Sequence, residues 1–303
     1  MEETEAQGLP SPVRLAFRVA YFGGHFMGSQ LQPGLRTVEG ELIAACTGLG
    51  LFSDWREANF ATSGRTDRGV HAIGQAMAFT TAHPGRAIET MNIRLPPDLW
   101  CVGYSPVSPG FHPRYDARWR TYRYYFREEG LDLVPMKAGA ALFEGVHDFS
   151  GFAKASLKNP VRSVLSASVG REGGIVYFEV TAQSFLWHMV RCMAKALEEA
   201  GTGGCEVEDI EQRLGGAYEK GLQPAPPEGL VLWDIGYDIE WRPMTEGDRR
   251  VANIKDLKGY YRIMNRICEI FEHGPGQVLQ DRNPRGAGPG QTGFPVRQHK
   301  EVR

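Results

Sequence analysis

The stretch "RLAFRVAYF", residues 14–22, sets the pattern from which the fold is inferred. Its apolar residues Leu15, Phe17, Val19 and Tyr21 occupy every second position. Because successive side chains of a strand point to opposite faces of a sheet, these four share one face. The stretch therefore predicts a half-buried β-strand.

The segments that follow extend this strand into a recognisable order. Residues 37–49 are typical of a helix with Thr37 as N-cap. A short strand is expected before residue 63, and the remaining patterns predict a strand at 75–82, a helix at 87–96 and a strand at 99–107. The order strand, helix, strand, strand, helix, strand is that of a ferredoxin-like unit.

A similar order recurs further along the chain. The patterns predict a strand at 120–127, a helix at 146–155, a hairpin of 162–171 with 174–182, helices at 184–201 and 206–216, and a strand at 230–238. The fold class expected is therefore α+β, with two ferredoxin-like (RRM-like) halves.

The expected division of the chain has four parts. Residues 1–12 are predicted to be a disordered tail, 13–107 the first half, and 108–240 the second half. In residues 241–303 we expect one long amphipathic helix or two shorter ones, followed by a flexible Gly-, Pro- and Arg-rich tail.

Composition narrows the class of protein. The 303 residues are 42% hydrophobic and 23% charged, with a net charge of -2 that argues against a uniformly basic nucleic-acid coat. No apolar run is long enough to span a membrane, and no signal peptide is evident, so a cytoplasmic protein is expected. The five cysteines and eight histidines show no metal-ligand spacing, which predicts free thiols and no metal site.

Basic residues gather in two places. One is "SGRTDRGVHAIGQ" (63–75), and the other is "FHPRYDARWRTYRYYFR" (111–127), where five arginines alternate with aromatic residues. Arginines neutralise phosphates and aromatic rings stack on bases, so the second segment suits RNA binding. An Arg-rich strand with core aromatics on its other face explains the same composition equally well.

Asp67 stands between Arg65 and Arg68 in the first of these segments. An Asp alone in a turn is most often a capping residue. Nearby cations favour the ionised form, however, and a held carboxylate can act as a nucleophile or stabilise a cationic sugar centre. Arg191, inside the apolar helix expected at 184–201, either reaches solvent or needs a partner, and pairing with Asp67 would account for both residues.

Three segments together resemble the motifs of the tRNA pseudouridine synthase A family. They are "GRTDRGVHAIGQ", "RTYRYYF" and "FEVTAQSFLWHMVRCMAKAL", and the run "FHPRYDAR" before the second also matches. The likeness covers about residues 13–240, and the three motifs in this order are strongly specific. Two positions depart from the family pattern: Phe22 stands where an acid is common, and Ser29 where the family has Trp. Both are expected in a loop that faces RNA.

The resemblance implies a cofactor-free isomerase that converts uridines 38–40 of the tRNA anticodon arm to pseudouridine. It implies one extended, mostly antiparallel sheet with helices on one face, a catalytic cleft between the halves, and a homodimer. The catalytic residues implied are Asp67 as nucleophile, Tyr122 against the target base, and Arg191 paired with Asp67. The implied substrate contacts are Arg65, His71, Tyr122, Phe185 and His188.

Two other readings of the residues stay open. A nucleoside or N-glycoside hydrolase also places a carboxylate at a sugar anomeric centre, and it would release free base. A non-catalytic RNA-binding module is the other, since ferredoxin-like sheets resemble RNA-recognition folds. The exposed-aromatic signature of that module is absent from the sequence.

Overall fold

The computed structural model describes residues 11–154, 159–215, 222–244 and 248–278. Residues 1–250 and 251–303 form two compact units, which we treat separately. Most of the tail predicted at residues 1–12, and the Gly-, Pro- and Arg-rich tail beyond Val278, lie outside the described residues.

The first half of unit 1 has the predicted ferredoxin-like order. Its elements are β1 (Val13–Tyr21), α1 (Val38–Gly48), β2 (Ala61–Thr62), β3 (His71–Thr81), α2 (Pro84–Arg94) and β4 (Leu99–Pro106). In the sheet they run β4-β1-β3, with β2 paired to β3, and all these pairs are antiparallel. Thr37 caps α1 as predicted, because its side chain accepts a hydrogen bond from the Gly40 amide at 3.2 Å.

The second half repeats this arrangement. Its elements are β5 (Trp119–Tyr125), α3 (Leu133–Leu142), β6 (Gly145–Asp148), β7 (Val161–Glu172), β8 (Ile175–Ala182), α4 (Met189–Gly201), α5 (Val207–Leu214) and β9 (Leu230–Gly236). The strands lie in the order β9-β5-β8-β7-β6. Gly173 and Gly174, both at positive φ, form the tight turn between β7 and β8. The predicted α+β fold is confirmed.

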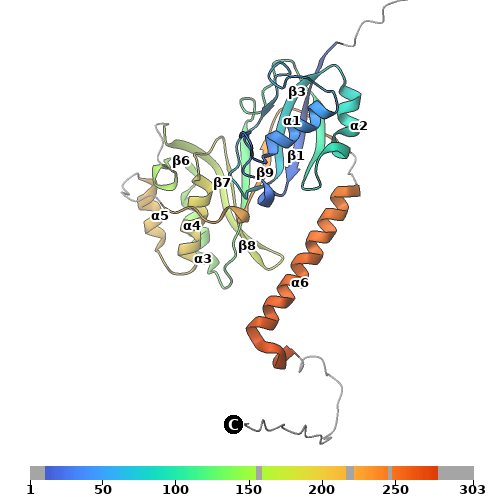
Figure 1. Cartoon of the computed structure of the whole chain (residues 1–303). Coiled ribbons are helices and arrows are strands. Elements are labelled where there is room, and N and C mark those ends of the chain that lie inside the picture. The colour runs from blue at the N-terminus through green and yellow to red at the C-terminus, as the bar shows by residue number, and fades with distance from the viewer. Residues whose placement is uncertain (1–10, 155–158, 216–221, 245–247, 279–303) are drawn as a thin grey trace, which may run out of the picture. The chain divides into compact units, whose positions relative to one another are not determined.

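The two halves share one sheet through the entrance of β3. His71 pairs with Val231 and Ala72 with Leu232, so β3 and β9 run parallel, whereas the other strand pairs are antiparallel. Figure 1 shows β9 between the two groups of helices, with α1 and α2 beside β1 and β3. The short β10 (Arg242–Pro243) adds to the outer edge, which makes a ten-stranded sheet.

Each half has its own hydrophobic core. Phe17, Phe79 and Leu42 belong to the first core, and Phe143 and Phe178 to the second. Burying a side chain of this size stabilises the fold by roughly 1.5–3 kcal/mol. The ring of Tyr122, on β5, packs against both cores. The junction between the halves is therefore packed as well as hydrogen-bonded.

The alternation of apolar residues in β1 predicted a half-buried strand, but the structure buries both of its faces. Arg14, Ala16 and Ala20 on its second face are also buried, at 4%, 0% and 1% exposure. Ala16 packs with Ala78 and Phe111 in a third cluster. The small side chains let chain segments after β4 and β9 lie across this face, which alternation within β1 does not reveal.

The helix predicted at 146–155 is wrong. That segment forms β6 and a 3₁₀ turn at Ser150–Phe152, and the helix of this half is α3. Pro135 obscures α3 in the sequence, but it lies in the first turn, where a missing N–H leaves no helical hydrogen bond unmade. Asp132 caps this turn by accepting from the Val134 amide at 2.8 Å.

The described part of unit 2, residues 251–278, lies in one helix, α6 (Asp248–Val278), whose first three residues belong to unit 1, so the single-helix alternative is confirmed. Several of its apolar side chains are exposed, among them Tyr260, Tyr261, Ile263 and Phe271. Within the described part of the chain, no helix is both long and apolar enough to cross a membrane. All five cysteines are free thiols, as expected.

Candidate active site

The loop that carries Asp67 is held at its two ends by hydrogen bonds. The Ser63 hydroxyl donates to the side-chain oxygen of Gln75, and the Gln75 amide donates to the carbonyl of Gly64 at 3.0 Å. Gln75 belongs to β3, so the strand itself positions the loop. The first and last residues of the motif therefore hold each other.

Thr66, immediately before Asp67, is held on three atoms. Its amide donates to the Ser29 hydroxyl at 2.8 Å, its carbonyl accepts from the Ser29 amide at 3.0 Å, and its hydroxyl lies 2.7 Å from that of Tyr21. Ser29 is only 1% exposed, so the expectation that it faces RNA is wrong. A small hydroxyl at this position binds the backbone of the motif loop instead.

Asp67 itself opens a tight turn into β3. The Val70 amide donates to the Asp67 carbonyl at 3.2 Å, and Gly69 between them has φ +86°. A residue with a side chain is rarely found at this angle, which explains the glycine. The turn leaves the Asp67 carboxylate partly exposed at the entrance of β3, where the two halves meet.

The segment before α4 is not helical, contrary to the prediction of a helix from residue 184. Helix α4 begins at Met189, and Phe185 to His188 form a loop that leads into it. His188 has φ +65°, a left-handed conformation that costs free energy for a residue with a side chain. Helical spacing therefore does not describe how Phe185 and His188 lie relative to Arg191.

Arg191, in the first turn of α4, is the partner of Asp67. Its Nη1 atom lies 2.9 Å from Oδ2 of the carboxylate, and its Nε atom donates to the carbonyl of Ala225 at 2.7 Å. The side chain of Arg191 is 12% exposed and that of Asp67 is 32% exposed. Since the guanidinium is fixed at two atoms, the carboxylate has a pre-oriented cation on one side.

His188 lies against the same carboxylate oxygen. Its Nε2 atom is 3.3 Å from Oδ2 of Asp67. Burial lowers the pKa of His188, and the cation of Arg191 lowers it further, although Asp67 acts in the opposite sense. The imidazole is therefore mainly neutral at pH 7.

Trp187 also contacts Asp67, and the sequence did not single it out. Its indole Nε1 donates to Oδ1 of Asp67 at 3.2 Å, and the residue is 56% exposed. The Nζ atom of Lys154 lies 4.2 Å from the centre of the Trp187 ring. The only sequence signal for Trp187 was its place in the motif between Phe185 and His188. That its indole N–H reaches the carboxylate could be predicted only if the conformation of the loop were known.

Tyr122 and Phe185 face each other beside this cluster. Their ring centroids are 5.1 Å apart with an interplanar angle of 89°. Burial raises the pKa of Tyr122 to about 12, with a smaller contribution from the negative charge of Asp67. The phenol is therefore neutral at physiological pH.

His71 occupies a different place. Its Nδ1 atom accepts a hydrogen bond from the Gly23 amide at 3.0 Å, and its ring packs edge-on against Phe22, with centroids 6.1 Å apart. Burial lowers the pKa of His71. Among the described residues the structure joins His71 to the Gly23 loop and records no bond to Asp67.

The arginines next to Asp67 in sequence do not hold it. Arg65 and Arg68 are both exposed, and within the described ranges neither forms an ion pair with Asp67. The carboxylate takes its cation from the other half of the protein. Arg65 and Arg68 are left at the surface beside the site.

The second basic segment is largely engaged within the protein. Three of its arginines pair with carboxylates: Arg118 with Asp238, Arg123 with Glu179, and Arg127 with Glu228. A fourth, Arg120, donates to the carbonyls of Arg114, Gln183 and Ser63. Four of the five arginines therefore have partners within the protein, which favours the structural explanation of the segment's composition.

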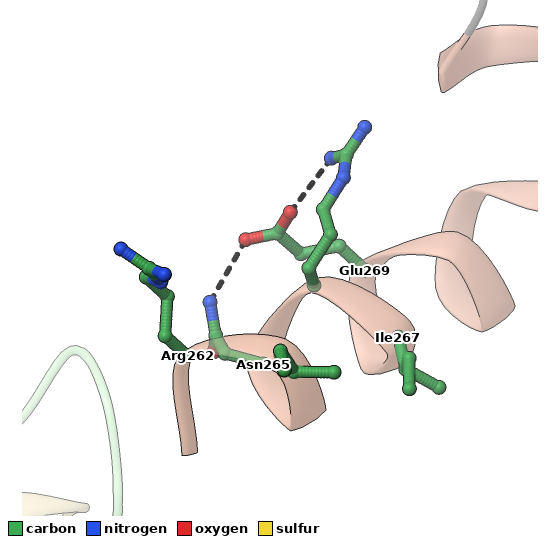
Figure 2. Close-up of a pocket in the computed structure, with 6 residues that line it drawn as sticks. Arg262, Asn265, Ile267 and Glu269 are labelled. Carbon is green, nitrogen blue, oxygen red and sulfur yellow. Dashed lines mark hydrogen bonds and ion pairs between the residues drawn. The ribbon is translucent and has the colours of Figure 1, made fainter. Parts of the chain in front are cut away.

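The hollow on α6 does not offer a comparable constellation. Figure 2 shows a surface hollow formed by α6 alone, where Glu269 accepts from Asn265 at 2.9 Å and from Arg266 at 2.8 Å. Residues of a single helix cannot enclose a ligand. The described residues contain no group of three or more His, Cys, Asp or Glu that could hold a metal ion.

Comparison with known proteins gives the family of this chain. A family model described as "tRNA pseudouridine synthase" matches residues 140–238. The tRNA pseudouridine synthase A of Methanoculleus marisnigri is 51% identical over 255 residues, which are 84% of this chain and 94% of that protein. That of Methanocorpusculum labreanum is 49% identical and covers 90% and 98%. That of Thermococcus sibiricus is 45% identical and covers 75% and 85%. A solved Cbf5-Nop10-Gar1 complex is similar over 73% of this chain and 49% of that chain, at 13% identity and a TM-score of 0.34.

Two ferredoxin-like halves that share one sheet, together with the tRNA pseudouridine synthase A relatives, define a pseudouridine synthase, an isomerase that acts on tRNA uridine. Within that class, the chain belongs to the tRNA pseudouridine synthase A family.

Proposed function

We propose that this protein converts uridine to pseudouridine in the anticodon arm of tRNA, at positions 38–40, and that Asp67 acts on the ribose of the target nucleotide. The observation that carries the proposal is the fixed carboxylate of Asp67, held by Arg191 at 2.9 Å beside the ring of Tyr122. The sites within tRNA come from the family resemblance.

The reaction breaks the N1–C1′ bond of uridine and joins C5 to C1′, while C5 loses a proton and N1 gains one. Reactant and product are isomers, so the reaction consumes no oxidant, reductant or phosphoryl donor. A base in a helix or loop must first leave its stack to reach the carboxylate. Asp67 then either attacks C1′ or removes a ribose proton to form a glycal, and both routes need an ionised carboxylate close to the sugar.

Arg191 has the role of orienting that carboxylate and stabilising its negative charge. A guanidinium bound at two atoms loses little freedom when it pairs, so its electrostatic effect is available without reorganisation. The neutral His188 supplies a second contact to the same oxygen. The second oxygen of Asp67 is then directed to the substrate side.

Tyr122 is assigned to the target base. Its ring lies at the junction of the two cores, and Phe185 meets it edge-on. A neutral phenol with a raised pKa is a poor base, so stacking on uracil is its main contribution. Acceptance of the C5 proton by the phenol oxygen of Tyr122 is a secondary role. It would require the phenol to pass a proton to another group at once.

The remaining assignments complete the proposal. Arg65 contacts the RNA backbone or the displaced base, while His71, Phe185 and His188 line the path of the target nucleotide. Residues 13–107 supply Asp67, and residues 108–240 supply Tyr122 and Arg191, so the active site lies in a cleft between these two halves. The protein acts as a cytoplasmic homodimer, as its family resemblance implies.

Tritium release from tRNA carrying [5-³H]uridine tests the central assignment. The wild-type protein is expected to release tritium, and Asp67→Asn is expected to release none while it retains tRNA affinity. Appreciable release by Asp67→Asn would remove Asp67 from this role. Liberation of free uracil would instead support an N-glycoside hydrolase, and binding without turnover by the wild type would support an RNA-binding module.

Mapping of the product then tests the positions. Pseudouridine is expected at 38, 39 and 40 in tRNA treated with the wild-type protein. Product confined to other positions would overturn the anticodon-arm assignment and leave the isomerase activity standing.

A further inference from the structure

We infer that Trp187 is a positioning residue, whose indole N–H directs the Oδ1 atom of Asp67 toward the ribose. The inference rests on the proposed role of Asp67. It distinguishes the two carboxylate oxygens from each other, and it holds that an exposed side chain orients the one that reacts.

The two oxygens of Asp67 have different surroundings. Oδ2 lies 2.9 Å from Arg191 Nη1 and 3.3 Å from His188 Nε2. Oδ1 has one contact among the described residues, the Trp187 indole at 3.2 Å. Each carboxylate oxygen can accept about two hydrogen bonds, so Oδ1 keeps a lone pair for the substrate. Oδ1 is therefore the oxygen that acts on the sugar.

An indole suits this task chemically. The Trp N–H is a donor only. It therefore cannot accept a proton from the carboxylate or compete with the carboxylate as a base. It is also neutral, and a neutral donor orients an oxygen without cancelling its charge as a second guanidinium would. One N–H can thus fix the direction of Oδ1 while leaving the oxygen nucleophilic.

The exposed ring is held in place from its own surroundings. The Lys154 amide donates to the Trp187 carbonyl at 3.1 Å, and the Lys154 ammonium lies over the ring at 4.2 Å. The His188 ring is 4.9 Å away and tilted by 50°. A side chain that is 56% exposed would otherwise sample several rotamers, so these contacts restrict the direction of its N–H.

This role differs from that of a simple stacking surface. If Trp187 only stacked on a nucleotide, its loss would weaken tRNA binding and raise KM. A residue that orients Asp67 instead affects the rate of the bound complex, because the substrate is already in place when the carboxylate acts. A loss in kcat therefore indicates a positioning role, whereas a rise in KM indicates a stacking role.

The test compares Trp187→Phe with Trp233→Phe in the full-length protein. Phenylalanine keeps an aromatic ring at residue 187 but removes the N–H. Trp233 lies on β9, where its ring packs against Arg123 at 3.8 Å, and among the contacts recorded for the described residues none joins it to Asp67. It is the matched control for replacing an indole. Both variants are assayed by tritium release, tRNA affinity and thermal unfolding.

Trp187→Phe is expected to lower kcat about 10-fold, the effect of one hydrogen bond to a charged group, with KM within about twofold of wild type. Lys154→Met should lower kcat about threefold, because it loosens the ring but keeps the N–H. Trp233→Phe should match wild type. An unchanged kcat for Trp187→Phe, or a loss confined to KM, would overturn the inference.

The outcome is distinguishable from failure of the proposed function. If wild type releases no tritium, or Asp67→Asn remains active, the role of Asp67 itself fails. If wild type is active and Asp67→Asn is inactive, but Trp187→Phe behaves as wild type, only the positioning role of Trp187 fails.

Discussion

Nη1 of Arg191 lies 2.9 Å from Oδ2 of Asp67, although 124 residues separate them in the chain. Asp67 precedes β3 in the first half, and Arg191 is in the first turn of α4 in the second half. The ion pair is therefore a contact between the halves, and the site is complete only when β3 and β9 are joined.

Replacement of Arg191 should damage catalysis more than stability. Arg191→Met removes the cation beside Asp67 and is expected to lower kcat by at least about 100-fold. The free energy of unfolding should fall by about 1–2 kcal/mol, less than for a fully buried pair because Asp67 is 32% exposed. Tritium-release kinetics and urea unfolding measure the two effects.

A double-mutant cycle with Asp67→Asn supplies the control. Once Asp67 has lost its charge, Arg191→Met should cost markedly less stability than in the wild type, because the two residues interact directly. Additive losses of stability would show that the two side chains act independently and contradict the pairing.

The ring of Tyr122 should matter for substrate binding. Tyr122→Leu removes the aromatic face and is expected to raise KM for tRNA about 10-fold, the effect of losing one base–aromatic stack. Tyr122→Phe keeps the ring, so its KM should stay within about twofold of wild type. Steady-state kinetics distinguish the two, and equal KM values for both variants would argue against stacking.

Salt dependence should reveal which surface arginines meet RNA. Arg65 is exposed and, among the described residues, has no acidic partner, whereas the exposed Arg118 pairs with Asp238 at 2.9 Å. Arg65→Ala is expected to reduce the slope of log affinity against log salt by about one, because one phosphate contact is lost. Arg118→Ala is the matched control and should leave the slope unchanged.

Adjacent glycines should respond very differently to a methyl group. A Cβ atom at Gly23 would lie 2.0 Å from the Val70 carbonyl oxygen, whereas one at Gly24 would meet nothing within 4 Å. Gly23→Ala must displace the turn after Asp67 and is expected to cost about 2 kcal/mol or more of stability, with loss of activity. Gly24→Ala should stay within about 0.5 kcal/mol of wild type. Chemical unfolding of the pair checks both, and similar stabilities would contradict the close packing of this loop.

Alkaline pH should weaken the fold through Tyr124. Burial at 1% exposure raises its pKa from 10.0 to about 12. The unfolded chain therefore loses this proton at lower pH than the folded protein, so stability falls as pH rises from about 10 toward 12. Tyr124→Phe should reduce that loss by about 1 kcal/mol at about pH 11.

The exposed Tyr115, at 76%, provides the control for Tyr124. Tyr115→Phe should leave the pH dependence of unfolding unchanged between neutral and alkaline conditions. If Tyr124→Phe and Tyr115→Phe gave the same alkaline profile as wild type, burial of Tyr124 would not be the cause of the loss.

Features whose signals are local were predictable from the sequence. The cap at Thr37 and the hairpin turn at Gly173 each depend on a few neighbouring residues, and both were predicted correctly. The helix of the second half was misplaced: it was predicted at 146–155, whereas α3 spans Leu133–Leu142 and contains Pro135 in its first turn, where proline permits a helix. The burial of both faces of β1 depends on remote chain segments, which a pattern within the strand does not report.

The sequence by itself determined the α+β order, the three motifs and the family to which the chain belongs. Only the tertiary structure decided what surrounds Asp67, because its partner arginine lies in the other half and the two arginines close to it in sequence, Arg65 and Arg68, remain at the surface. Likewise, it is the left-handed residue His188 and the loop before α4 that bring Trp187 to Oδ1. A contact across more than a hundred residues depends on how strands pair and helices pack, and short-range patterns carry no record of it.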